Sequence, residues 1–425
     1  MNKIKDLITK LARHELISGS FYIFIGTTIS SALAFILNLY LVRGLTYAEY
    51  GIFSALISLI LLLSIPAQSL VAIIVKYAAG FFANNEIARA GAFYFKLFKY
   101  LLLFGVLIMI SFVIFSPTIA SFLNIEDYGL IILAGVSVAV GYMAILNSAF
   151  LQSMLLFGKV GLLNVLSGIA KLIVGVFLVY LGFEVFGALF GNLMFPIIGL
   201  VGGFIILRKI ISQRAQKVNI PINEFIKYAF PAAIAIISLS SFISTDVILV
   251  KHYFTPDEAG LYGGMSLIGR VIFYFTGPIP LVMFPLIVKR HSKGEKYNSL
   301  LFLSLVLVFL AGASITVFYY LFPEFTISIF LGGRDYFILA PIIGLFGIFL
   351  TLYSLNNVMI SYFLSIKKTF VSVIVLIFAL LQIGLIYIYH DTFSHIIYVS
   401  IISTLLLMIS LVLYYLWINY KKEFI

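Results

Sequence analysis

The stretch "LLLFGVLIMISFVIF" (residues 101–115) contains no charged residue and no alternation of apolar with polar positions. A membrane-spanning strand alternates apolar and polar residues over segments of about ten, so this continuous run excludes a transmembrane β-barrel. An α-helix that crosses a bilayer needs ~20 mostly apolar residues. The stretch therefore predicts a transmembrane helix.

Stretches of this kind recur along the whole chain. Of its 425 residues, 63% are hydrophobic and 10% are charged, with a mean hydropathy of +1.17. Soluble chains are roughly 45–50% apolar and about 25% charged, so the solvent of this chain must be lipid. Twelve spans are expected, near residues 18–41, 51–75, 97–116, 129–151, 160–182, 185–207, 225–250, 260–288, 299–322, 336–364, 369–389 and 395–418.

The net charge of +11 is explained by membrane orientation and not by nucleic-acid binding. If both termini are cytoplasmic, most Lys and Arg residues fall in inner segments, whereas the outer side carries only Arg43, Lys251 and Arg334 among acidic residues such as Asp257 and Glu324. Such a bias is the positive-inside rule. The expected partners are accordingly membrane lipids, with no nucleic acid. The cationic inner groups include Lys3, Lys5, Lys10, Arg13, Lys76, Arg89, Arg208, Lys209, Arg214, Lys217, Lys289, Arg290, Lys367 and Lys368.

No enzyme, metal or cofactor motif stands out. Cysteine is absent, which excludes thiol chemistry. There is no phosphate-binding loop and no His pair at metal spacing. His390 and His395 flank Asp391, but one short loop is not expected to build a metal site. The basic amphipathic start of the chain lacks the pattern of a cleavable signal peptide.

The longest polar inner connection, "RKIISQRAQKVNIPINE" (208–224), divides the chain into two sets of six spans. We expect a six-helix bundle over 1–207, a cytoplasmic basic linker over 208–224 and a second bundle over 225–425. An even number of spans per half gives both halves the same orientation, as in transporters built from parallel repeats. The predicted fold is an all-α integral membrane protein with twelve transmembrane helices, in two parallel-related six-helix bundles around a central cavity.

One short phrase occurs in both halves. "LVRGLTYAEYG" (41–51) and "LVKHYFTPDEAG" (249–260) share Leu-Val, a cation, Thr-x-x-Glu and Gly, each just after the first helix of its half. Thr-x-x-Glu predicts a capping box, in which Thr and Glu satisfy each other's free backbone amides at a helix start. Two caps can arise independently, but the shared register of the other residues favours a duplication.

These residues resemble the polysaccharide exporters, or O-antigen flippases, of the superfamily that also holds multidrug extruders and lipid II flippases. That family carries a cation-x-Leu-x-x-x-x-Tyr-Gly phrase after its first helix. The matching residues here are Arg43, Leu45, Tyr50 and Gly51 and, in the second half, Tyr228, Pro231, Asp246, Gly260, Leu261, Tyr262 and Pro285 to Arg290.

The resemblance implies a function and its partners. It implies a flippase in the cytoplasmic (inner) membrane that moves a polyprenyl-pyrophosphate-linked oligosaccharide from the inner to the outer leaflet. The partners implied are this lipid-linked oligosaccharide and polysaccharide polymerase machinery. An ion-coupled multidrug or small-molecule exporter of the same superfamily is the alternative. A glycosyltransferase, polymerase or ligase is disfavoured because every outer loop is short.

Charges inside the spans are the candidate functional groups, because a charge at a helix centre costs ~2.5–3.5 kcal/mol and normally faces a cavity or a partner. Lys171 shares a helical face with Asn164, Gly168 and Gly175, and we expect this small polar face to line the cavity. Snorkelling of Lys171 toward the inner surface is the competing interpretation. Arg270 can bind a phosphate with two donors or pair with a carboxylate.

The remaining candidates each have two interpretations. Asp246 is either an ion-coupling site or a structural partner of Arg270 or Lys251. Arg43 and Lys251 at the outer mouth either receive the pyrophosphate on release or are solvated interfacial cations. The intramembrane amides either line the cavity, where they contact sugar hydroxyls, or hold helix pairs together; they are Asn38, Asn147, Asn192, Asn356 and Asn357. Asn164 is expected to line the cavity beside Lys171.

Overall fold

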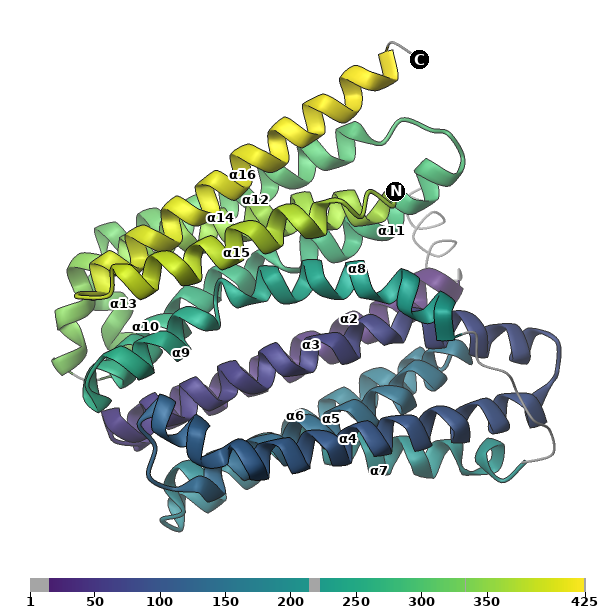
Figure 1. The fold of residues 1–425 in the computed structure, drawn as a ribbon, viewed down its shortest axis with the longest axis horizontal. Helices are drawn as coiled ribbons and strands as arrows, with labels where there is room; N and C mark the ends of the chain where they lie inside the picture. Colours follow the sequence, from purple (N-terminus) through teal and green to yellow (C-terminus); the bar gives the residue numbers. More distant parts are fainter. Residues whose placement is uncertain (1–14, 214–221, 333, 424–425) are drawn as a thin grey trace, which may run out of the picture. The chain divides into compact units, whose positions relative to one another are not determined.

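The computed structural model describes residues 15–213, 222–332 and 334–423. The basic residues Lys3, Lys5, Lys10 and Arg13, and residues 214–221 of the predicted linker, lie outside the described residues. The described residues form helices and loops (Figure 1). Eleven helices are long and apolar enough to cross a membrane, or twelve if the bent pair Phe230–Ser241 and Thr245–Tyr253 is one span. The predicted all-α membrane fold with twelve spans is confirmed.

The helices divide between two compact units, which are described here one at a time. Unit 1 comprises residues 1–45 and 63–229, and unit 2 comprises residues 46–62 and 230–425. Unit 1 therefore takes only the later part of α3 (Tyr47–Ala83), whose first turns belong to unit 2. The predicted boundaries at 207 and 225, and the predicted central cavity, stay predictions. The other helices of unit 1 are α2 (Glu15–Gly44), α4 (Ile87–Leu123), α5 (Tyr128–Ser153), α6 (Phe157–Tyr180) and α7 (Glu184–Ile211).

Glycines allow the helices of unit 1 to pack closely. A side chain on Gly191 of α7 would collide with Gly175 of α6, and one on Gly161 of α6 would lie 2.5 Å from Tyr22 O of α2. Small residues let helix backbones approach in a membrane, where lipid supplies no hydrophobic drive for association. Helices α2, α6 and α7 therefore form one tightly packed layer of unit 1.

Unit 2 contains helices that are interrupted inside the membrane. The seventh span bends by 46° between α8 (Ile222–Ser241) and α9 (Thr245–Tyr253). The eighth span is interrupted at Gly277 between α10 (Pro256–Thr276) and α11 (Pro278–Ser292), because Pro278 has no N–H to continue the ladder. The remaining elements are α12 (Asn298–Leu321), α13 (Pro323–Phe330), a 3₁₀ turn at Arg334–Leu339, α14 (Ala340–Ser365), α15 (Val371–Ile388) and α16 (Phe393–Glu423); α14, α15 and α16 lie side by side (Figure 1).

The two copies of the repeated phrase form the same local structure. Thr46 N–H donates to the Glu49 carboxylate at 2.8 Å, and Glu49 N–H donates to Thr46 Oγ1 at 3.3 Å. Thr255 and Glu258 make the same reciprocal pair, at 3.0 Å and 3.4 Å. Both predicted capping boxes are confirmed, one at the start of α3 and one at the start of α10.

The glycines of the phrase have a packing role that the sequence did not reveal. Within unit 2 the first turns of α3 and α10 cross at these residues. A Cβ on Gly51 would lie 2.9 Å from Gly260 N, and one on Gly260 would collide with the carbonyl oxygen of Tyr47. Tyr47 also donates to Asp335 Oδ2 at 2.9 Å. Equivalent residues of the two halves thus touch each other directly.

Candidate functional site

Lys171 lies in the middle of α6 in unit 1 and is half-buried. Its Nζ donates to Asn192 Oδ1 of α7 at 2.7 Å. In the described part of the chain, no carboxylate oxygen lies within 4.0 Å of Nζ. A neutral amide orients the ammonium group but does not neutralise it. Lys171 therefore has a hydrogen-bond partner but, among the described residues, no carboxylate counter-charge.

The small face around Lys171 is used for packing more than the sequence suggested. Gly168 faces Ser30 of α2, with an ideal Cβ 2.9 Å from its Oγ, and Gly175 faces Leu37 of α2 at 3.1 Å. Asn164 Nδ2 donates to Thr27 Oγ1 at 3.4 Å. These two positions are occupied by glycine because α2 packs closely against α6 there, so the small face contacts a neighbouring helix. The expectation that Lys171 and Asn164 line a cavity stays a prediction.

Arg270 lies in α10 of unit 2, and its guanidinium has only weak partners. Nη2 lies 3.5 Å from both Ser58 Oγ and Ile243 O, and its buried Nε has no hydrogen-bond partner. Hydrogen bonds of N–H to oxygen are normally 2.7–3.2 Å long. The buried rings of Tyr50 and Tyr353 lie near enough to interact electrostatically with Arg270. The guanidinium thus has donors left over for a ligand.

Asp246 lies in the first turn of α9 and is fully buried. Tyr262 Oη of α10 donates to its Oδ2 at 2.9 Å, and Val247 N–H donates to its Oδ1 at 2.8 Å. Arg270 is close enough to interact electrostatically with Asp246, but its printed hydrogen bonds go to Ser58 and Ile243. The carboxylate thus ties α9 to α10 through a tyrosine, a partner that the sequence interpretation did not name.

Arg43 and Lys251 occupy matching places in the repeat but differ in burial. Arg43 is exposed, whereas Lys251 is 1% exposed. Both interpretations from the sequence, release of pyrophosphate and a solvated interfacial cation, need an exposed ammonium group at position 251. The buried Lys251 therefore does not meet the expectation of an exposed cation, whereas the exposed Arg43 does.

The candidate asparagines Asn147 and Asn356 hold helices together. Asn147 of α5 is fully buried; it accepts from Tyr94 Oη at 2.6 Å and donates to Leu200 O of α7 at 2.7 Å. Asn356 of α14 is also fully buried and donates to Thr404 O of α16 at 2.9 Å. Asn38 donates to Ala34 O one turn earlier in its own helix. These contacts support the helix-pairing role for Asn147 and Asn356.

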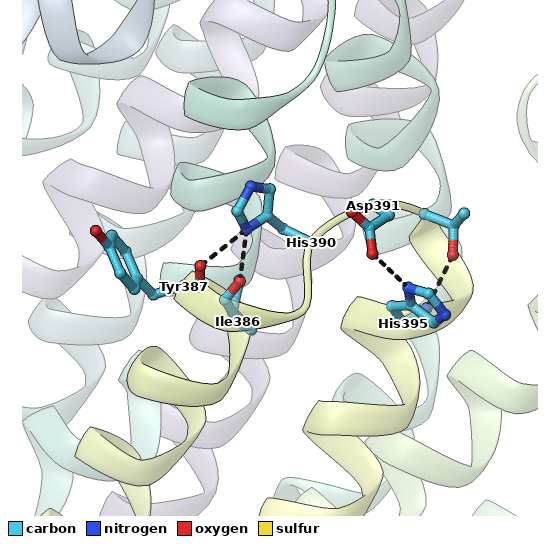
Figure 2. A network of polar contacts seen from close by, with 6 residues as sticks. Ile386, Tyr387, His390, Asp391 and His395 are labelled. Atoms are coloured by element: carbon cyan, nitrogen blue, oxygen red, sulfur yellow. Dashed lines mark hydrogen bonds and ion pairs between the residues drawn. The ribbon is translucent and has the colours of Figure 1, made fainter.

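His390, in the loop between α15 and α16, and His395, in the first turn of α16, have different partners (Figure 2). His390 Nδ1 lies 3.1 Å and 3.0 Å from the carbonyl oxygens of Ile386 and Tyr387, so this nitrogen carries the proton, and the ring stacks on Tyr253 at 3.8 Å. His395 Nδ1 pairs with Asp391 at 3.4 Å. Among the described residues, no group of three His, Cys, Asp or Glu could hold a metal ion.

The sequence interpretation missed two partners of the charged groups. Asn192 orients Lys171 from 21 positions away, and Tyr262 binds Asp246 from 16 positions away. Both partners lie on the helix that follows the charged group. An intramembrane polar residue on the next helix of a hairpin was the only available signal, and it does not fix which way either side chain points.

The fold is shared with solved transporters. An inward-facing multidrug resistance MATE family transporter of the MOP superfamily is 15% identical with a TM-score of 0.74, covering 95% of this chain and 98% of that one. The lipid II flippase MurJ in an inward closed conformation is 16% identical with a TM-score of 0.71, covering 94% and 87%. An outward-facing MATE transporter is 16% identical with a TM-score of 0.64, covering 97% and 98%.

The sequence comparisons identify a family. A comparison with curated proteins finds no relative that matches significantly. The model of the polysaccharide biosynthesis protein family matches residues 40–337, from the end of α2 to the turn before α14. This match spans more than half of the chain and includes the repeated phrase, Lys171, Asp246 and Arg270. The chain belongs to the polysaccharide biosynthesis protein family.

Proposed function

We propose that this protein is a flippase that moves a polyprenyl-pyrophosphate-linked oligosaccharide from the inner to the outer leaflet of the cytoplasmic membrane, for surface polysaccharide biosynthesis. Both termini are cytoplasmic in this proposal, as the distribution of Lys and Arg indicates. The family membership and a fold shared with MATE transporters and the lipid II flippase support it.

The observation that carries the proposal is the pairing of two intramembrane cations with neutral partners. Lys171 is bonded to an amide, and Arg270 lies near a hydroxyl and a carbonyl. A membrane-embedded charge costs ~2.5–3.5 kcal/mol unless a cavity or partner compensates it. Among the described residues neither cation has a carboxylate within 4.0 Å, although Arg270 interacts electrostatically with Asp246. Two such cations suit an anionic cargo, and a pyrophosphate is one.

Arg270 is the half-buried group of its cluster. The neighbouring rings of Tyr50 and Tyr353 are buried, so the contact with the cargo is assigned to the guanidinium and not to the rings. The polyprenyl chain remains in the bilayer while the charged head passes through the protein by alternating access. Asp246 is a structural anchor for Tyr262 in this proposal.

A reconstituted leaflet assay tests the proposal. The purified chain in proteoliposomes is given a fluorescent polyprenyl-pyrophosphate disaccharide, and a membrane-impermeant quencher reports the outer-leaflet fraction. The wild type should move the probe, and the Lys171→Ala/Arg270→Ala double variant should not. Lys159→Ala and Arg89→Ala are matched controls, because both cations are exposed at helix ends, and they should retain transport.

The same variants separate the flippase from its alternative. The fold shared with multidrug transporters makes an ion-coupled exporter of small organic cations the second candidate. Removing two positive charges should leave export of a cationic dye unchanged or improved, since it removes repulsion. Export of the dye by the double variant, together with no movement of the pyrophosphate probe by the wild type, would overturn the flippase proposal.

A further inference from the structure

Helix α3 is shared between the two units. Residues 46–62 belong to unit 2 and residues 63–83 to unit 1, yet the helix runs without a loop from Tyr47 to Ala83. A continuous helix that belongs to two compact bodies must bend if those bodies reorient. The position of the change, between Leu62 and Leu63, is therefore the place to search for a hinge.

The first turns of α3 are firmly attached to unit 2. Tyr47 Oη donates to Asp335 at 2.9 Å, Gly51 packs against Gly260, and an added Cβ on Gly263 would lie 2.6 Å from Ser54 Oγ. These contacts involve side chains and close backbone approach over about two turns. This part of the helix moves with unit 2 and cannot itself supply the flexibility.

One rung of the helix is missing just after the boundary, and the acceptor of the next rung has a side-chain partner. Pro66 has no N–H, so the rung to Leu62 O is not made. Tyr142 Oη, from α5, donates to Leu63 O at 2.9 Å. Leu63 O is also the helical acceptor for Ala67 N–H, so the hydroxyl competes for the acceptor of the next rung. Proline and a side chain that enters the helix ladder are recognised causes of helix bending.

The equivalent helix of unit 2 is interrupted at a similar depth. Pro278 lies 212 positions after Pro66, and there the single residue Gly277, with helical dihedral angles, separates α10 from α11. Thr276 Oγ1 at this break donates to Ser354 Oγ of α14 at 3.0 Å. Helices α5 and α14 are the fourth spans of their halves. In each half, a hydroxyl from the fourth span supports a proline-interrupted second span.

We propose that residues 62–67 of α3 form a hinge. Tyr142 is a positioning residue that keeps this segment able to bend. Its hydroxyl donates to Leu63 O, so this carbonyl keeps a partner in the membrane when bending stretches its rung from Ala67 N–H. Attachment of residues 46–54 to unit 2 is thereby compatible with reorientation of the units during a transport cycle.

Hydrogen exchange of the purified protein in lipid nanodiscs tests the hinge independently of any substrate. Tyr142→Phe removes the hydroxyl and leaves Ala67 N–H as the donor to Leu63 O, and Pro66→Ala restores the preceding rung. Each variant should slow exchange of the peptide covering residues 62–70 by about fivefold to tenfold, the factor expected for one hydrogen bond, and the double variant should slow it further. Pro117→Ala in exposed α4 is the matched control.

The outcomes are separable from those of the flippase proposal. Movement of the fluorescent pyrophosphate probe should fall about tenfold in Pro66→Ala and stay unchanged in Pro117→Ala. If Tyr142→Phe instead speeds exchange at 62–70, the hydroxyl is only a structural tether and the proposal is wrong. Unchanged exchange in Pro66→Ala also overturns it. Slowed exchange in a protein that does not move the probe supports the hinge while the flippase proposal fails.

Discussion

The fifth and sixth spans of each unit are joined by one polar bridge, and the two bridges differ in charge. In unit 1, Lys171 of α6 donates to Asn192 of α7 at 2.7 Å. In unit 2, Gln382 of α15 donates to Ser400 of α16 at 2.8 Å. The two donors lie 211 positions apart and the two acceptors 208. An uncharged pair suffices to join these helices, so the charge of Lys171 is not needed for packing.

The fourth and sixth spans show a second contrast. Asn147 and Asn356 are separated by 209 positions, as are Gly51 and Gly260 (356 − 147 = 260 − 51), and each donates to a carbonyl of the sixth span of its half. Asn147 Oδ1 accepts from Tyr94, whereas Asn356 Oδ1 has no partner. The amide bridge is a shared feature of the scaffold, complete in unit 1 and incomplete in unit 2.

The largest effect should come from exchanging the charge between the first pair of bridges. Lys171→Gln keeps a donor for Asn192, so stability should change by less than ~1 kcal/mol, but movement of the pyrophosphate probe should fall by roughly 10–100-fold, the loss of one charge-assisted contact. The leaflet assay and thermal unfolding in micelles measure both quantities. Unchanged transport would show that the charge has no part in function.

The reverse exchange, Gln382→Lys, should not restore transport to Lys171→Gln. Gln382 is fully buried, so the new charge costs ~2.5–3.5 kcal/mol at the centre of a helix and should lower the thermal stability. Restored transport in the double variant would mean that only the number of intramembrane charges matters and not the unit that carries them.

A smaller effect should distinguish the two asparagines. Asn147→Leu removes two hydrogen bonds and should destabilise unit 1 by about 1–2 kcal/mol, on the basis of membrane hydrogen bonds of ~0.6 kcal/mol, at most ~1.7. Asn356→Leu removes one bond but also an unpartnered oxygen, so its effect should be close to zero. Denaturant unfolding of the two variants measures the difference. Equal losses would show that Asn356 Oδ1 is satisfied in solution.

The smallest effects should be equal in the two halves. Thr46→Ala and Thr255→Ala each remove the acceptor of a capping box with the same geometry, which should cost ~1 kcal/mol in either case. Thr→Ser at the same positions keeps the hydroxyl and serves as the control. If the stability losses of the two alanine variants differ by more than about 1 kcal/mol, the two helix starts share the geometry of their hydrogen bonds but not the stability that these bonds contribute.

Local features could be predicted from the sequence and long-range ones could not. The spans follow from apolar runs, and the capping boxes follow from Thr and Glu three positions apart. The bend after Ser241 has no proline or glycine to announce it; Ser241 Oγ instead donates to Ser238 O in its own helix, the kind of bond that competes with the helix ladder.

Side-chain directions were the main gap, for a physical reason. A helix that is apolar on all sides has no clear inward face, so the sequence could not assign Gly168 and Gly175 to α2 or Lys171 to Asn192. The same limitation hid Tyr142, whose partner in α3 lies 79 positions away. The rarity of charges inside membrane spans located Arg270 and Asp246, but not the hydroxyl groups that contact them.

The contact between Gly51 and Gly260 ties the evolution of the two halves together. A methyl group added at either glycine would collide with the backbone of the other segment, so the two positions constrain each other. Suppressors of Gly51→Ala selected in the laboratory should therefore arise in the first turns of α10, on the opposite repeat. A larger residue at either glycine therefore requires a compensating substitution in the other segment.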